Sequence, residues 1–100
     1  MQTDGIQEIQ SKVDAERAQV AALDGQLSDS GLKKQLQQAT SWLDDVENIF
    51  LLSARQEKRT PEALGRWLSY AVVPLDWAIQ RRKQLQRNVA NYGHNAQTIG

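Results

Sequence analysis

Residues 60–79 read TPEALGRWLSYAVVPLDWAI, and this stretch decides the fold of the chain. Thr60 is a favoured N-cap residue and Pro61 suits the first helical position, so a helix is expected to begin here. The apolar residues then recur every three or four positions, which is the spacing of one helical face. They are Leu64, Leu68, Ala71, Leu75 and Ala78. The spacing predicts a helix over residues 61–92, because Gly93 suits the position just after a helix end.

Pro74 lies inside this predicted helix. Proline has no backbone N–H, and its ring collides with the carbonyl group four residues earlier, which belongs to Tyr70. We therefore expect a kink over residues 70–74, or a break into two helices there.

Two further segments, over about residues 4–28 and 31–58, are rich in good helix formers such as Gln, Ala, Leu, Glu and Lys. The turn-forming cluster Ser28-Asp29-Ser30-Gly31 separates them. The second segment carries an apolar seam that ends at Val46 and Phe50. No β-branched run alternates with period two, so the sequence predicts an all-α fold.

The turn at residues 58–60 is short, so the second and third helices are expected to form an antiparallel hairpin. Each of these helices has more apolar surface than one neighbour covers, whereas the first helix offers one narrow stripe. We expect the first helix to complete a three-helix bundle, with a single domain over residues 1–100 and a flexible tail at 93–100. Long helices on so short a chain leave a large surface for their volume, which favours a homodimer.

The excess apolar surface includes three tryptophans and a tyrosine, residue types that are enriched at the centres of protein interfaces. The candidate protein-binding or oligomer surface consists of Trp42, Ile49, Leu52, Trp67, Tyr70 and Trp77. The alternative is that the aromatic rings all serve the core of the monomer.

The 12 basic and 12 acidic residues give a net charge of zero. The charge is nevertheless uneven, since residues 1–50 hold nine acidic and four basic side chains and residues 51–100 hold three and eight. In the hairpin, six basic residues gather at the end far from the turn and form a possible anion or partner patch. They are Lys33, Lys34, Arg81, Arg82, Lys83 and Arg87. The alternative is that these side chains are simply hydrated.

Two charged residues, Glu16 and Arg82, occupy positions in the apolar stripes where Leu or Ala is expected. In the bundle their heights differ by roughly 9 Å, which two long side chains can bridge. A buried Glu16–Arg82 pair would fix the register of the first helix on the third. The alternative is that Arg82 extends past its neighbours to water.

The sequence argues against most enzyme classes. It has no cysteine, which excludes disulfides, Cys-ligated zinc and thiol catalysis, and its single histidine, His94, falls in the predicted tail. The acidic run Asp44-Asp45-Val46-Glu47 has no Glu-x-x-His partner and is typical of a hydrated helix face. We expect no catalytic residues, no cofactor and no metal.

No apolar run approaches the ~20 residues that span a bilayer, and the polar N-terminus does not resemble a signal peptide. We expect a cytoplasmic protein with no membrane contact, of the small kind common in bacteria and phages. The function predicted is that of a non-catalytic regulator, inhibitor or adaptor that binds another protein and itself. The alternatives are a small nucleic-acid-binding protein that uses the basic end, and a structural subunit that forms oligomers.

Overall fold

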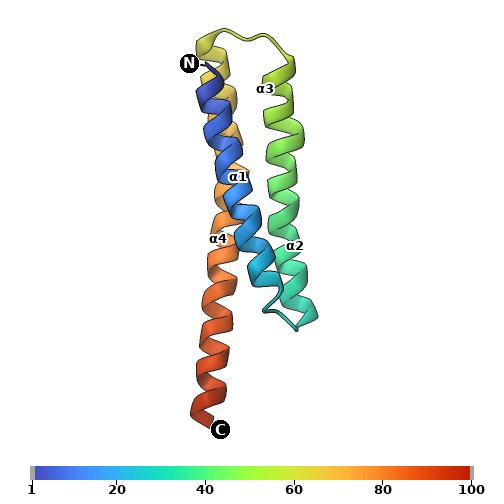
Figure 1. Ribbon diagram of the computed structural model, residues 1–100, viewed down its shortest axis with the longest axis vertical. Coiled ribbons are helices and arrows are strands. Elements are labelled where there is room, and N and C mark those ends of the chain that lie inside the picture. Colours follow the sequence, from blue (N-terminus) through green and yellow to red (C-terminus); the bar gives the residue numbers. More distant parts are fainter. Residues whose placement is uncertain (1, 100) are drawn as a thin grey trace.

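The computed structural model describes the backbone over residues 2–99 and the side chains over residues 5–90. Its elements are α1 (Gln2–Asp24), α2 (Ser30–Asp45), the π-helix η1 (Val46–Leu51), α3 (Leu52–Gln56) and α4 (Pro61–Ile99). No strand occurs over residues 2–99, so the predicted all-α fold is confirmed. Because α2, η1 and α3 follow one another without a gap, they form one long rod beside α4 (Figure 1).

Two side-chain caps explain where the second and fourth helices begin. Asp29 Oδ1 accepts a hydrogen bond from the backbone N–H of Leu32 at 2.9 Å, directly before α2. Thr60 Oγ1 accepts one from the N–H of Ala63 at 3.1 Å, directly before α4. Each cap satisfies one of the backbone donors that a helix start leaves free.

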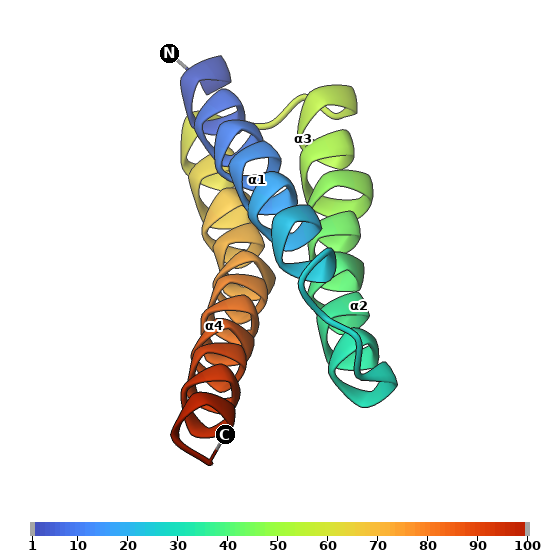
Figure 2. The same cartoon turned by 60° about the horizontal axis from the view of Figure 1, so that its bottom comes forward.

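The α2–η1–α3 rod and α4 run antiparallel, and α1 lies against both of them on one face of this hairpin (Figure 2). The three rods share one apolar core, to which each contributes. Its completely buried members are Val13, Ala39, Leu43, Val46, Leu51, Ala71, Ala78 and Leu85. The opposite face of the hairpin has no helix on it over the described residues.

The π-helix changes which residues of the second rod face the core. A π-turn holds more residues than an α-turn, so it interrupts the three- and four-residue spacing of the apolar seam. The seam runs through Leu43 and Val46 and then reaches Leu51, which is 0% exposed, and Ala54. The predicted seam position Phe50 is only partly buried, so the expectation of an uninterrupted α-helical stripe was wrong at this point.

The helix bounds differ from prediction at two other places. α1 ends at Asp24, although the apolar stripe suggested about residue 28. α4 continues through Pro74 and Gly93 to Ile99, so it neither splits at the proline nor ends near residue 92 before a tail. The side chain of His94 lies outside the described residues.

The molecule is elongated, with principal extents of 60 × 20 × 17 Å. The C-terminal part of α4 runs past the start of α2 at one end (Figure 1). Among the described residues, no helix combines the length and the apolar character that a bilayer crossing requires. The long hairpin therefore presents an extended side surface, and part of it is apolar.

Candidate protein-binding face

Two tryptophans meet on the side of the hairpin that α1 leaves open. The rings of Trp42 on α2 and Trp77 on α4 have centroids 5.8 Å apart and are tilted by 59°. The guanidinium carbon of Arg81 lies 5.2 Å from the centroid of Trp42, within the range of a cation–π contact. Trp42 is thereby partly covered, whereas Trp77 remains 53% exposed.

Ile49 and Tyr70 form a second layer on the same side. Because the helices are antiparallel and Trp42 faces Trp77, residue 49 lies at about the height of residue 70. Ile49 is 52% exposed and Tyr70 60% exposed. Val73 lies between Tyr70 and Trp77 on the same helical stripe, and it is also exposed. We call these five residues, Trp42, Ile49, Tyr70, Val73 and Trp77, the aromatic face.

Trp67 belongs to the hairpin itself rather than to this exposed set. Its indole N–H donates to the backbone carbonyl of Phe50 at 2.8 Å, and the two rings lie 4.9 Å apart. Arg59 covers the other side, with its guanidinium carbon 4.7 Å from the ring centroid. Trp67 thus ties α4 to the second rod near the turn and is not free to bind a partner.

Leu52 is 44% exposed but follows the π-helix. The extra residue of the π-turn rotates everything after it relative to Trp42 and Ile49. Leu52 is therefore not part of the aromatic face as we define it, although α-helical spacing grouped it there. Of the six residues expected on the surface, four lie together and exposed or partly exposed, and Val73 joins them.

The six basic residues of the predicted patch do not form one set of free charges. Lys33 Nζ lies 3.6 Å from Asp24 Oδ1, and Arg81 lies over Trp42. Arg82 is held by Glu16. The remaining three, Lys34, Lys83 and Arg87, are exposed. Half of the predicted positive charge is thus already engaged within the chain.

The structure brings Glu16 and Arg82 into a buried ion pair. Arg82 donates from Nε to Glu16 Oε2 at 2.7 Å and from Nη2 to Oε1 at 2.6 Å, and Glu16 is only 4% exposed. A third donation goes from Nη1 to Gln86 Oε1 at 3.0 Å. The hydrogen bond to the Glu16 carboxylate raises the pKa of Arg82, so the arginine stays charged. This geometry matches the bidentate pairing that arginine makes with carboxylates.

A second polar cluster joins α1 to the other rod. Arg17 donates to Asp44 Oδ1 at 2.8 Å and, from Nε, to Glu47 Oε1 at 2.8 Å. Gln10 donates to Glu47 Oε2 at 2.9 Å and accepts from Arg55 at 2.9 Å. The hydrogen bond from Gln10, together with that from Arg17, lowers the pKa of Glu47. We expected these acidic residues to be hydrated, because sequence alone did not show that Arg17 faces them.

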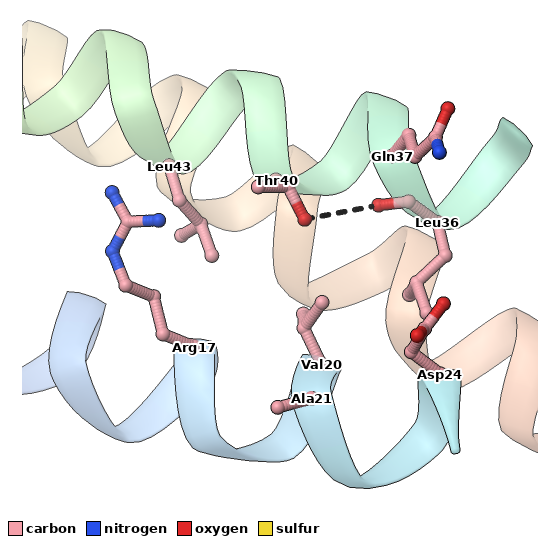
Figure 3. Close-up of a pocket in the computed structure, with 8 residues that line it drawn as sticks. All are labelled: Arg17, Val20, Ala21, Asp24, Leu36, Gln37, Thr40 and Leu43. Atoms are coloured by element: carbon pink, nitrogen blue, oxygen red, sulfur yellow. Dashed lines mark hydrogen bonds between the residues drawn. The ribbon is translucent and has the colours of Figure 1, made fainter. Parts of the chain in front are cut away.

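A shallow groove of about 280 Å³ lies between α1 and α2 (Figure 3). Its lining consists of Arg17, Val20, Ala21, Asp24, Leu36, Gln37, Thr40 and Leu43. Three of the polar side chains there already have partners: Arg17 and Asp24 form ion pairs, and the Thr40 hydroxyl donates to the Leu36 carbonyl at 3.4 Å. Over the described residues, no three His, Cys, Asp or Glu side chains gather as metal ligands. The groove offers no convergent set of reactive groups.

Comparisons with protein-family models, with curated proteins and with solved structures found no match for this chain.

Proposed function

We propose that this protein acts by binding another protein through the aromatic face, as a non-catalytic regulator, inhibitor or adaptor, and that it does so in the cytoplasm. The observation that carries the proposal is the exposure of Trp77 and Tyr70, at 53% and 60%, side by side with Ile49. Large apolar side chains are normally covered, and exposed clusters of them mark interaction sites.

The size of this surface supports a protein partner rather than a small molecule. A tryptophan and a tyrosine each bury about 150–250 Å² when fully covered, so the exposed halves of Trp77 and Tyr70 together offer about 200 Å². At about 25 cal/mol per Å², covering them contributes about 5 kcal/mol. Association itself costs a comparable amount, so binding requires the whole face and not one ring. A long, flat partner surface such as a helix supplies that contact.

The proposal is tested by capture of partners from an extract of the native host, using tagged chain. Trp77→Lys places a charge in the centre of the aromatic face, whereas Val72→Lys places the same charge on a neighbouring exposed position next to α1. We expect a partner that the unmodified chain and Val72→Lys capture and that Trp77→Lys loses. Equal capture by both variants would place the binding surface elsewhere and would contradict the proposal.

A further inference from the structure

We propose that a second copy of this chain covers the aromatic face, forming a homodimer whose two-fold axis runs parallel to the helices. The inference goes beyond the proposed function: it starts from the same exposed surface but names a second copy of this chain as the protein that covers it. In this dimer the α2–η1–α3 rod of each copy packs over α4 of the other. The two hairpins then make four central helices, and each copy of α1 lies on the outside.

The accessible area is consistent with such an interface. A compact protein of 11.3 kDa exposes about 5,700 Å². This chain exposes 6603 Å². The overhang of α4 accounts for part of the excess accessible area. The aromatic face contributes another part, which is apolar. A standard interface removes about 800 Å² from each partner, so the aromatic face would need the flanking side chains of both rods to reach that size.

Each layer of the aromatic face is suited to pack against the same layer of a second copy. Each layer takes one residue from the second rod and one from α4: Trp42 with Trp77, and Ile49 with Tyr70. A two-fold axis parallel to the helices leaves heights unchanged and exchanges the two rods. Trp42 then meets the Trp77 layer of the partner copy, and Ile49 meets the Tyr70 layer. This isologous contact places aromatic rings on aromatic rings and aliphatic groups beside them.

The charges beside the aromatic face favour a two-fold axis parallel to the helices over one that runs across them. On α4 the stripe Arg66, Tyr70, Val73, Trp77 and Arg81 has an arginine at each end. On α2 the exposed Asp45 follows Trp42 by three residues, so it lies on the same side of the helix. The pairing of Trp42 with Trp77 sets Asp45 at about the height of Pro74, midway between the two arginines and about 11 Å from each along the axis.

A two-fold axis parallel to the helices therefore places Asp45 of each copy over α4 of the other, at a height between Arg66 and Arg81. A two-fold axis across the helices would instead stack α4 on α4 and the second rod on itself. That arrangement turns the arginine ends toward each other and Asp45 toward its own copy. Because like charges in contact are unfavourable, the structure selects the first arrangement.

The chain offers a closely matched pair of variants for the test. Val72 and Val73 are neighbours on α4 with nearly equal exposure, 46% and 45%, but only Val73 lies on the aromatic face, and Val72 lies beside α1. Val73→Lys and Val72→Lys should both fold, as circular dichroism would show. In sedimentation equilibrium, we expect the unmodified chain and Val72→Lys to have twice the mass of 11.3 kDa. We expect Val73→Lys to weaken association at least tenfold.

The direction of the axis is tested by disulfide formation. Because the chain has no cysteine of its own, only the introduced cysteines can form the bond. We expect a mixture of Asp45→Cys and Val73→Cys chains, one of them tagged, to form the mixed disulfide, whereas neither variant alone does so efficiently. Efficient cross-linking of Asp45→Cys to itself would overturn the parallel axis.

Two further outcomes separate this inference from the proposed function. A chain that stays monomeric up to millimolar concentration overturns the homodimer, while capture of another protein that Trp77→Lys abolishes would leave the proposed function standing. A homodimer that Val73→Lys disrupts, with no other protein captured, supports the inference and contradicts the proposed regulator or adaptor role. A dimer disrupted by Val72→Lys but not by Val73→Lys overturns the inference.

Discussion

The carboxylate of Glu16 is the least exposed charge in the described part of the chain, and Arg82 is its counter-ion. Burying a single carboxylate is costly, and the pair offsets that cost only while both members are present. Such a pair adds little net stability compared with apolar residues of similar size. Its physical effect is to favour one height of α1 on α4, because any sliding separates the charges.

Removing one member of the pair is expected to destabilise the protein far more than removing both. Arg82→Leu leaves Glu16 buried without a counter-ion and should lower the free energy of unfolding by about 3–5 kcal/mol. Glu16→Leu with Arg82→Leu should recover most of this loss. The measurement is urea unfolding followed by circular dichroism. Lys83→Leu, an exposed neighbour, is the control and should change stability by about 0.5 kcal/mol or less. Arg82→Leu matching this control would contradict the prediction.

At the scale of elements, α1 is attached to the second rod through a group that titrates. Because the pKa of Glu47 is lowered by hydrogen bonds from Gln10 and Arg17, the folded state favours the charged form. The resulting stability is present above the ordinary pKa of about 4.3 and is lost as the pH falls through the lowered value.

Glu47→Gln is therefore expected to lower the melting temperature at pH 7 and to have a smaller effect at acidic pH, as the pH falls through the lowered pKa of Glu47. Thermal melting at a series of pH values measures the difference. Glu8→Gln changes an exposed carboxylate whose contact is with Lys12 on the same helix, and it should give nearly no difference at either pH. A Glu47→Gln effect that does not shrink as the pH falls would show that the lost contact is not ionic.

The π-helix makes the second rod tolerant of a deletion at one place and intolerant at another. Deleting the exposed Asn48 from η1 should convert the π-turn to an α-turn and keep Val46 and Leu51 on the core side. Deleting the exposed Gln38 from α2 instead rotates Leu36 away from Ala39 by about 100°. We expect the first variant to fold, within about 2 kcal/mol of the unmodified chain, and the second to unfold.

Chemical unfolding of the two deletion variants measures this contrast, and an equal loss of stability in both would contradict it.

The hairpin of the second rod and α4 also shows which features the sequence could predict and which it could not. The caps at Asp29 and Thr60 could be predicted from the sequence, because in each a single side chain satisfies a nearby backbone donor. The π-turn was not predicted, because the apolar spacing of the segment fits an uninterrupted α-helix; the structure instead places Leu51 in the core and the Phe50 carbonyl against the Trp67 indole.

At the scale of the whole molecule, too, the features that the sequence predicted depend on local spacing, and those that it missed depend on packing between helices. The all-α fold follows from apolar spacing, and Glu16 and Arg82 stood out as charged residues in apolar stripes. The partners of Arg17, and the fact that Trp67 is partly buried whereas Trp77 is exposed, depend on the rotation of each helix about its own axis. An error of one residue in that rotation moves a side chain by about 100°, which exceeds the width of a face.

The proposed homodimer makes the stability of the whole molecule depend on its concentration. Anything that binds only the folded chain stabilises it by mass action, and a second copy is such a ligand. For an unfolding enthalpy of about 0.7 kcal/mol per residue in each chain, the melting temperature should rise by about 3 °C for each tenfold increase in concentration. Val73→Lys should melt at a temperature that does not depend on concentration over the range in which it is monomeric, whereas Val72→Lys should follow the unmodified chain. Calorimetry across a hundredfold range measures this, and a flat profile for the unmodified chain would mean that the aromatic face is not covered by its own copy.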